Sequence, residues 1–363
     1  MIMPSTRNIS LVFKAVPKGM PIPGEHLIIE DRPIDLEKIP ENGLVVRNIY
    51  NSLDPYMRLM LVEPDTKHYR KPCTLNSPLR SLAVAEVIHS SCDDYPIGTL
   101  IRTSLPIAEY SVLSREDIDM ASSSAKVKTL PSSTTLHPAY YLGPLGMPGL
   151  TAYSSLFEIG KPRPGETIFV SSAAGAVGQI VGQIARLQGL KVIGSAGSAV
   201  FNYKEESTLS ALQRLAPEGI DIYFDNVGGQ TLEDALACMR KHGRIIVCGM
   251  LSQYDSTSST DTSQSSYGVK NLFRLFSQGL TMRGFQVGMR DFGPKYEEDF
   301  ERDMGFWIGE GKIKAVVSEV TGIERGAEGF VGMLKGDGFG KACLRVEGSG
   351  VGGGDGRELF RRI

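Results

Sequence analysis

Short runs of apolar or alternating residues, separated by proline, glycine and aspartate, fill residues 8–130 of the chain. The clearest runs are LVFKAV, GLVVRNIY, SLAVAEVIH, GTLIRTS and AEYSVL. Each run has the length and composition of a strand, and the residues between the runs favour turns. The pattern predicts a mostly β domain in the first third of the chain.

Beyond residue 142 the pattern changes to strands that alternate with amphipathic helices. The strand-like runs are ETIFVSSA, KVIGSAG, GIDIYFDNV and RIIVCGM, and the helix-like runs between them are GAVGQIVGQIARLQG, LSALQRLA and TLEDALACMRKHG. Such alternation predicts a parallel sheet with helices on both faces.

The last third of the chain mixes regular elements with polar segments. We expect a helix near residues 271–278, a strand at 280–285, a helix near 296–309 and a strand pair that ends at KACLRVE. The serine-rich segment 251–268 is expected to be a long loop, and the glycine-rich tail 347–363 is expected to be disordered.

Composition and charge exclude several classes of partner. The 363 residues are 41% hydrophobic and 22% charged, which fits a soluble globular protein long enough for two domains. The formal net charge of −2 arises without long runs of either sign, so we expect neither a nucleic acid nor a membrane surface as a partner.

The cysteines and the N-terminal segment indicate a compartment. The five cysteines form no CxxC pair, which favours a reducing compartment over a disulfide framework or a zinc lobe. The start, MIMPSTRNIS, lacks the apolar core of a signal peptide, and no apolar run approaches the roughly 20 residues of a membrane span. We therefore expect a cytoplasmic protein.

The turn AAGAVG after the strand at residues 167–171 is the strongest chemical signal. Ala173, Gly175 and Gly178 occupy the three slots of a GxGxxG turn, with Ala176 and Val177 between the last two, and a helix follows. Small residues let backbone N–H groups approach a pyrophosphate at a helix N-terminus. The turn therefore predicts a dinucleotide site, although a tight turn that binds nothing has the same pattern.

The end of the next strand selects between the two nicotinamide cofactors. It reads GSAGS, without the Asp or Glu that usually binds the ribose hydroxyls of NAD. This favours NADPH over NADH, with Ser195 and Ser198 as hydroxyl donors.

Seven stretches, in order along nearly the whole chain, resemble one family. They are NSLDPYMR at 51–58, LGMPGLTAY at 145–153, AAGAVGQIVGQIARLQG at 173–189, FNYK at 201–204, YFDNVGG at 223–229, GRIIVCG at 243–249 and MLKGDGFGK at 333–341. The chain resembles the zinc-independent medium-chain dehydrogenases/reductases that include prostaglandin reductase (leukotriene B4 12-hydroxydehydrogenase) and the alkenal double-bond reductases.

The resemblance implies a fold and an activity. The fold is a GroES-like β-barrel catalytic domain over residues 1–136 and 296–346, with a Rossmann domain, a doubly wound parallel sheet, over 137–295. The activity is NADPH-dependent reduction of a carbon–carbon double bond conjugated to a carbonyl. No metal is expected, because the zinc ligands of related enzymes have no counterpart around DPYMR.

The resemblance also implies the site residues. Tyr254 corresponds to a tyrosine that faces substrate, where a phenol stabilises an enolate oxygen, and Tyr56 forms a second wall of the site. On the cofactor side the implied residues are Tyr203, Asn226, Cys248 and Gly249. A surface tyrosine, a core tyrosine and a turn asparagine remain the alternatives for Tyr254, Tyr56 and Asn226.

One element of the family pattern is missing. Similar proteins have a further helix between the GSAGS segment and the strand that carries FNYK, but here only Ala199 and Val200 separate Ser198 from Phe201. A parallel connection takes about a dozen residues, because the chain must travel back along the strand. We therefore expect this strand to shift, to become a loop, or to pair antiparallel. A trimmed nucleotide domain and a misread exon boundary both explain the gap.

Two other functions and one assembly remain open. The first alternative function is a quinone reductase of the same superfamily, which needs no group that donates a proton to a carbon atom. A homologue with an impaired cofactor site is the other alternative, because the missing helix ordinarily carries a basic residue for the adenosine phosphate. The resemblance also implies a possible homodimer through the sheet edge near residues 280–285.

Overall fold

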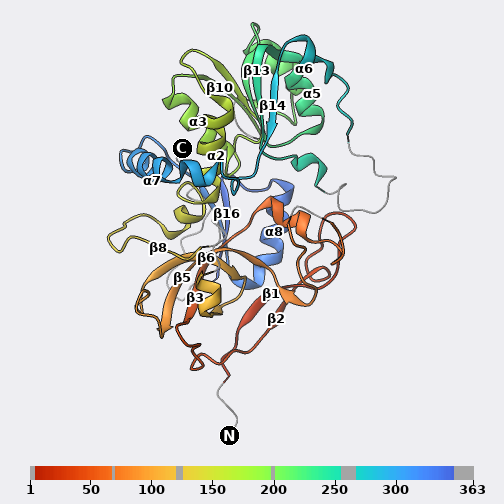
Figure 1. The fold of residues 1–363 in the computed structure, drawn as a ribbon. Coiled ribbons are helices and arrows are strands. Elements are labelled where there is room, and N and C mark those ends of the chain that lie inside the picture. Colours follow the sequence, from red (N-terminus) through yellow and green to blue (C-terminus); the bar gives the residue numbers. More distant parts are fainter. Residues whose placement is uncertain (1–4, 68–69, 120–125, 198–200, 255–266, 347–363) are drawn as a thin grey trace. The chain divides into compact units, whose positions relative to one another are not determined.

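The computed structural model describes residues 5–67, 70–119, 126–197, 201–254 and 267–346 (Figure 1). The expected tail at 347–363, most of the expected loop at 251–268, and Ser198 lie outside the described residues. The chain divides into two compact units. The first unit takes in the chain up to Leu142, Val317–Gly338 and the chain from Ala342, and the second takes in Gly143–Val316 and Phe339–Lys341.

The first unit is built on two sheets, as the alternating runs predicted. The smaller sheet has the order β2 (Leu27–Asp31), β1 (Ile9–Phe13) and β4 (Ser77–Pro78), paired antiparallel. The larger sheet has the order β15 (Val317–Thr321), β16 (Lys341–Arg345), β3 (Leu44–Ser52), β5 (Arg80–Ser90), β6 (Leu100–Pro106) and β8 (Lys128–Thr129), and β7 (Tyr110–Leu113) also pairs with β3.

The core of the first unit joins its strands to one C-terminal helix. The helical segments are η1 (Pro55–Met60), α1 (Arg115–Asp119), η2 (Pro138–Leu142), η5 (Ile323–Arg325) and α8 (Gly326–Lys335). Phe330 of α8 is fully buried in one cluster with Leu11, Phe13 and Leu344. Helix α8 was not among the elements expected from the sequence.

The second unit contains the expected parallel sheet. Its six strands have the order β11 (Phe201–Asn202), β10 (Lys191–Ala196), β9 (Thr167–Val170), β12 (Ile220–Asp225), β13 (Met239–Val247) and β14 (Thr281–Gly284), and every pair is parallel. Its helical segments are α2 (Met147–Ser155), η3 (Leu156–Gly160), α3 (Gly178–Leu187), α4 (Thr208–Leu215), α5 (Gly229–Cys238), η4 (Leu251–Gln253), α6 (Phe273–Ser277) and α7 (Gly293–Gly309).

Helices cover both faces of this sheet, as alternating βα units require. On one face, Gly160 of η3 lies close to Ile222 and Gly182 of α3 lies close to Val192. A Cβ atom at either glycine would contact that neighbouring side chain. On the other face Tyr223 packs with residues of α4 and α5 in a buried cluster, and its ring stacks on Phe169 at a centroid distance of 5.0 Å.

The predicted helix TLEDALACMRKHG was wrong in its last residues. Helix α5 ends at Cys238, and Met239 already pairs with Ile220 in the sheet. The register shifts between Ile220 and Ile222, so the extra residues are absorbed by an irregularity of β13. Burial of the Met239 side chain in the core cluster favours the strand over another helical turn.

Only the first half of FNYK forms a strand, β11, and it pairs parallel, which corrects the expected antiparallel alternative; Tyr203 and Lys204 form a turn. Phe201 and Asn202 of β11 pair with Ser195 and Ala196 of β10. A connection of about a dozen residues is needed where two parallel strands pair along their whole length. Here only the last two residues of β10 are paired, so the chain does not travel back along the strand length.

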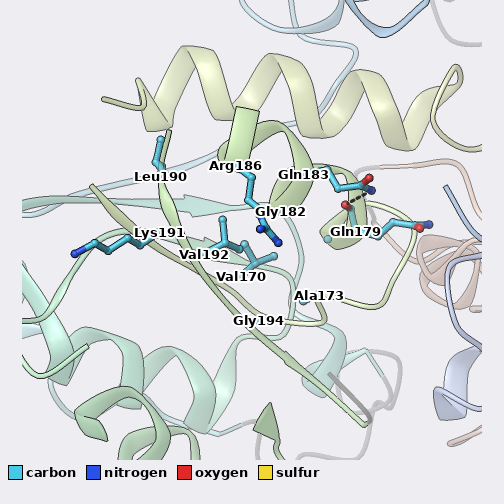
Figure 2. Close-up of a pocket in the computed structure, with 11 residues that line it drawn as sticks. Val170, Ala173, Gln179, Gly182, Gln183, Arg186, Leu190, Lys191, Val192 and Gly194 are labelled. Atoms are coloured by element: carbon cyan, nitrogen blue, oxygen red, sulfur yellow. Dashed lines mark hydrogen bonds between the residues drawn. The ribbon is translucent and has the colours of Figure 1, made fainter. Parts of the chain in front are cut away.

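The missing crossover helix leaves part of one sheet face open. The steps from β9 to β10 and from β10 to β11 run in the same direction, so right-handed crossovers place both connecting helices on the α3 face. A pocket of about 450 Å³ lies there, lined by Val170, Gly182, Arg186, Val192 and Gly194 among others (Figure 2). This space is where the second helix would pack.

The chain returns to the first unit at Val317, whereas the sequence suggested residue 296. Helix α7 spans residue 296 and packs on α2 of the second unit. The Tyr153 hydroxyl donates to the Asp303 carboxylate at 2.6 Å, and its ring meets that of Phe300. Within the described residues, no helix is long and apolar enough to cross a membrane.

Candidate functional site

The carboxyl ends of β9, β10, β12 and β13 carry most of the predicted cofactor residues. The strand order reverses between β9 and β12, because β10 lies on one side of β9 and β12 on the other. Open parallel sheets bind ligands at the carboxyl ends beside such a reversal. The sheet topology therefore places the predicted dinucleotide turn where a ligand is expected.

The turn after β9 is held by backbone contacts on two sides. The Ala173 N–H donates to the Ser195 carbonyl at 2.9 Å, which joins the turn to β10. The Gly340 N–H donates to the Ala174 carbonyl at 2.7 Å, and Gly175 forms a parallel bridge with Gly340. These contacts fix the turn before any ligand binds.

Gly178 is required where the turn enters α3. A Cβ atom at this position would lie 2.3 Å from the Ser172 carbonyl oxygen and 2.8 Å from the Ala173 Cα. Both neighbours are backbone atoms, so neither can move without opening the turn. Ala176 and Val177 are half-buried within the turn, and the Val177 carbonyl accepts from the Ile180 N–H in the first turn of α3.

A buried polar cluster joins the ends of β9 and β12. The Asn226 N–H donates to Ser171 Oγ at 2.9 Å, and its side-chain Nδ2 donates to the Ser171 carbonyl at 2.7 Å. The Tyr223 hydroxyl donates to Asp225 Oδ1 at 2.7 Å. Asn226 therefore has the structural role of a turn residue, and its predicted contact with the cofactor stays a prediction.

Tyr254 lies at the end of η4, close to the carboxyl ends of β12 and β13. A Cβ atom at Gly249 would lie 3.1 Å from the Tyr254 hydroxyl and 3.3 Å from the Asn226 carbonyl oxygen. The half-buried phenol therefore sits over Gly249, beside Asn226. The structure brings these three predicted site residues together.

The remaining predicted cofactor residues differ in exposure. Ser195 is 4% exposed within β10, whereas Tyr203, just after β11, is 53% exposed. Burial and the nearby Asp225 carboxylate raise the pKa of the Cys248 thiol to about 12, so this thiol stays protonated at neutral pH. Cys248 thus offers a small neutral surface rather than a nucleophile.

Tyr56 belongs to the first unit, in η1. Its ring packs against the core cluster of that unit, and the Arg70 guanidinium lies 4.4 Å from the ring centroid. These contacts match the core-tyrosine alternative, and its role as a wall of the site stays a prediction.

A zinc site has no ligand set in the part of the chain that the structure describes. No three His, Cys, Asp or Glu side chains come together there to hold a metal ion. These residues therefore do not fit zinc, and the absence of a metal from the protein stays a prediction.

Sequence reasoning missed Ser171 and Asp225, which are both fully buried. A usable signal was present, because each is a polar residue at the carboxyl end of an apolar run, in TIFVSS and IYFDN. Polar groups in such a place are normally hydrogen-bonded and often shape a site.

Two family models match the chain. Residues 10–120 match the N-terminal domain of oxidoreductase, and residues 176–304 match a family described as zinc-binding dehydrogenase. The two matches lie largely in the first and second units, respectively.

Characterised relatives and solved structures match over nearly the full chain. NADP-dependent oxidoreductase RED1 of Cochliobolus heterostrophus is 44% identical, over 94% of this chain and 98% of its own length. The 2-alkenal reductase (NADP(+)-dependent) of Nicotiana tabacum is 39% identical, over 85% and 89%. The crystal structure of CurA in complex with NADPH from Vibrio vulnificus has a TM-score of 0.81 at 30% identity, over 94% and 100%.

These matches confirm the expected combination of a GroES-like domain and a Rossmann domain. The chain belongs to the medium-chain dehydrogenase/reductase superfamily, among its zinc-independent NADPH oxidoreductases.

Proposed function

We propose that this oxidoreductase reduces the carbon–carbon double bond of α,β-unsaturated aldehydes or ketones, by hydride transfer to the β carbon. The observation that carries the proposal is the position of the Tyr254 hydroxyl over Gly249, at the carboxyl end of β13. The 39% identity to a 2-alkenal reductase supports the same substrate class.

The cofactor is NADPH, and the second unit has residues that fit it. The turn at residues 173–178 offers backbone N–H groups without bulky side chains, as a pyrophosphate requires. Strand β10 ends at Ala196 without an acidic residue, so nothing there repels a 2′-phosphate. When bound, NADPH supplies the hydride.

Tyr254 would act on the substrate oxygen. Hydride addition at the β carbon of an enone moves negative charge to the carbonyl oxygen, which becomes an enolate. A phenol is a good hydrogen-bond donor that stays neutral near pH 7. Because the enolate carries more charge than the ketone, the Tyr254 hydrogen bond strengthens in the transition state and raises kcat.

The test is NADPH oxidation with a short 2-alkenal, comparing the wild type with Tyr254→Phe. We expect kcat to fall by about 10²-fold with a smaller change in KM, as for loss of one oxyanion donor. Tyr267→Phe is the matched control, because the Tyr267 hydroxyl bonds to Gln230 and Glu233 of α5 instead.

The two alternatives give different results in the same assay. A quinone reductase would oxidise NADPH with quinones and would be indifferent to Tyr254→Phe. A homologue with an impaired cofactor site would oxidise no NADPH with any enone or quinone at millimolar cofactor.

We also propose a homodimer through the edge of β14. Among the residues that the structure describes, this strand ends the sheet, and in the neighbouring α6 the side chains of Phe273 and Phe276 are 71% and 82% exposed. An edge strand beside exposed aromatic rings favours pairing with another copy. Light scattering after size exclusion should give twice the mass of 39.4 kDa at micromolar concentration, and a monomer would contradict the dimer.

The compartment we propose is the cytoplasm. All five cysteines are free thiols in the structure, and free thiols are typical of a reducing compartment.

A further inference from the structure

Asp225 is a buried carboxyl group that the proposed chemistry does not use. Its side chain is fully buried at the carboxyl end of β12. Oδ1 accepts three hydrogen bonds, from the Val227 N–H at 3.0 Å, the Gly228 N–H at 2.8 Å and the Tyr223 hydroxyl at 2.7 Å. Oδ2 is buried and has no hydrogen-bond partner in the described part of the chain.

Burial of this carboxyl group costs free energy. Desolvation raises its pKa, and the hydrogen bonds from Gly228, Tyr223 and Val227 oppose that rise. A hydrophobic residue would avoid the cost but could not accept from two consecutive backbone N–H groups. The carboxylate therefore determines the backbone path of residues 225–228, which we call the β12 turn.

The β12 turn also holds residues 248–252, the segment that leads to Tyr254. The Asp225 carbonyl accepts from the N–H groups of Cys248 and Gly249, at 2.8 and 3.0 Å. The Asn226 carbonyl accepts from the Leu251 N–H at 3.1 Å. The Val227 carbonyl accepts from Ser252, both from its N–H at 3.1 Å and from its Oγ at 2.7 Å. Three successive carbonyls of the turn thus fix residues 248–252.

We propose that Asp225 is a positioning residue for Tyr254. Its carboxylate shapes the β12 turn, the carbonyls of the turn hold residues 248–252, and this segment places the Tyr254 hydroxyl over Gly249. The catalytic consequence rests on the proposed function, because it assumes that Tyr254 acts on the substrate. The structural consequence, the ordering of residues 248–252, is independent of it.

The first measurement is hydrogen–deuterium exchange at the Leu251 and Ser252 amides. In Asp225→Ala these amides should exchange at least tenfold faster than in the wild type. Asp303→Ala is the control, since this half-buried aspartate of α7 accepts from the Tyr153 hydroxyl of α2 and makes no hydrogen bond to the β12 turn in the described part of the chain. Unchanged exchange in a folded Asp225→Ala protein would overturn the proposal.

The second measurement is kcat in a double-mutant cycle with Tyr254→Phe. Asp225→Ala should lower kcat by about tenfold in the wild type, since small misplacements of catalytic groups are costly, and should cause no further loss in Tyr254→Phe. An equal loss in both backgrounds would indicate a general structural effect and overturn the positioning role.

A conservative variant keeps the test usable if Asp225→Ala folds poorly. The amide oxygen of Asp225→Asn can accept the same three hydrogen bonds, so this variant should recover most of the lost kcat and the slow exchange. Fast exchange in a folded Asp225→Asn would contradict the proposal. If Tyr254→Phe alone leaves kcat unchanged, the proposed role of Tyr254 fails, and the exchange data still decide whether Asp225 orders the segment.

Discussion

At the scale of single residues, the site depends on two positions that have no Cβ atom. Gly249 leaves room for the Tyr254 hydroxyl, and Gly178 lets α3 begin directly at the turn. Both glycines stand at the carboxyl edge of the sheet, where the chain approaches itself closely. A single methyl group at either position would move a neighbouring group of the site.

Replacing Gly249 by Ala should lower kcat by about tenfold. The new Cβ would lie 3.1 Å from the Tyr254 hydroxyl, so the phenol has to shift, and displaced catalytic groups lose activity steeply. Steady-state kinetics with a 2-alkenal measures the effect. Gly305→Ala in α7 is the control, because a Cβ there meets no atom within 4 Å. An unaffected kcat in Gly249→Ala would argue against a role for the Tyr254 position.

At the scale of elements, the α3 face of the second unit's sheet is partly open beside β10. Val192 is half-buried at the pocket along α3, whereas Val170 of the neighbouring strand β9 is fully buried. Both valines line the pocket, so the pair compares a covered and a half-exposed position on the same face of the sheet.

Val170→Ala should destabilise the protein by about 2 kcal/mol, and Val192→Ala by less than half of that. The cost of removing methyl groups follows the apolar area and packing that are lost, which are smaller at a half-exposed position. Urea unfolding of both variants gives the two values. Equal costs would show that the α3 face above Val192 is covered after all.

The ion pair of Glu166 and Arg244 joins the start of β9 to β13. The guanidinium donates to both carboxylate oxygens, at 2.9 and 2.6 Å. Burial alone would raise the pKa of Glu166, but the hydrogen bonds from Arg244 and from the Arg163 N–H outweigh burial and lower it.

Because the pKa of Glu166 is lower in the folded protein, its stabilising effect is present above the pKa of the unfolded chain, about 4.3. It is lost as the pH falls from there through the folded pKa. The unfolding free energy of Glu166→Gln should therefore differ most from the wild type above pH 5, and the two should converge on acidification. A difference that does not depend on pH would contradict this assignment.

At the scale of the whole molecule, the order of the two units could be predicted from the sequence. The change from short β runs to alternating strands and helices near residue 142 lies close to the division of the chain between Leu142 and Gly143, whereas the resemblance implied a boundary at residue 136. The turn at 173–178 and helix α3 could be predicted from local residue spacing. Small residues in the turn and an apolar face of the helix each produce a recognisable pattern in the sequence.

The features that could not be predicted depend on contacts between distant residues. The two-residue parallel pairing of β11, the early start of β13 at Met239 and the burial of Asp225 all arise from neighbours in the sheet rather than from local propensity. The contacts of the β12 turn could not be predicted either, because its carbonyls accept hydrogen bonds from a segment more than twenty residues further along the chain.

We expect the second unit to bind NADPH although the crossover between β10 and β11 is reduced to four residues. The turn at 173–178 and the ends of β12 and β13 do not depend on the missing helix for their contacts. We expect the loss of one charge-assisted phosphate contact to weaken binding by ten- to a hundredfold at most, from about 1.5–3 kcal/mol.

The decisive measurement is a titration of the purified chain with NADPH, followed by nicotinamide fluorescence, with NADH in parallel. We expect saturable binding at micromolar NADPH and much weaker binding of NADH. The absence of saturable NADPH binding would contradict it, because the residues at the carboxyl ends of the sheet would then not suffice to hold the cofactor.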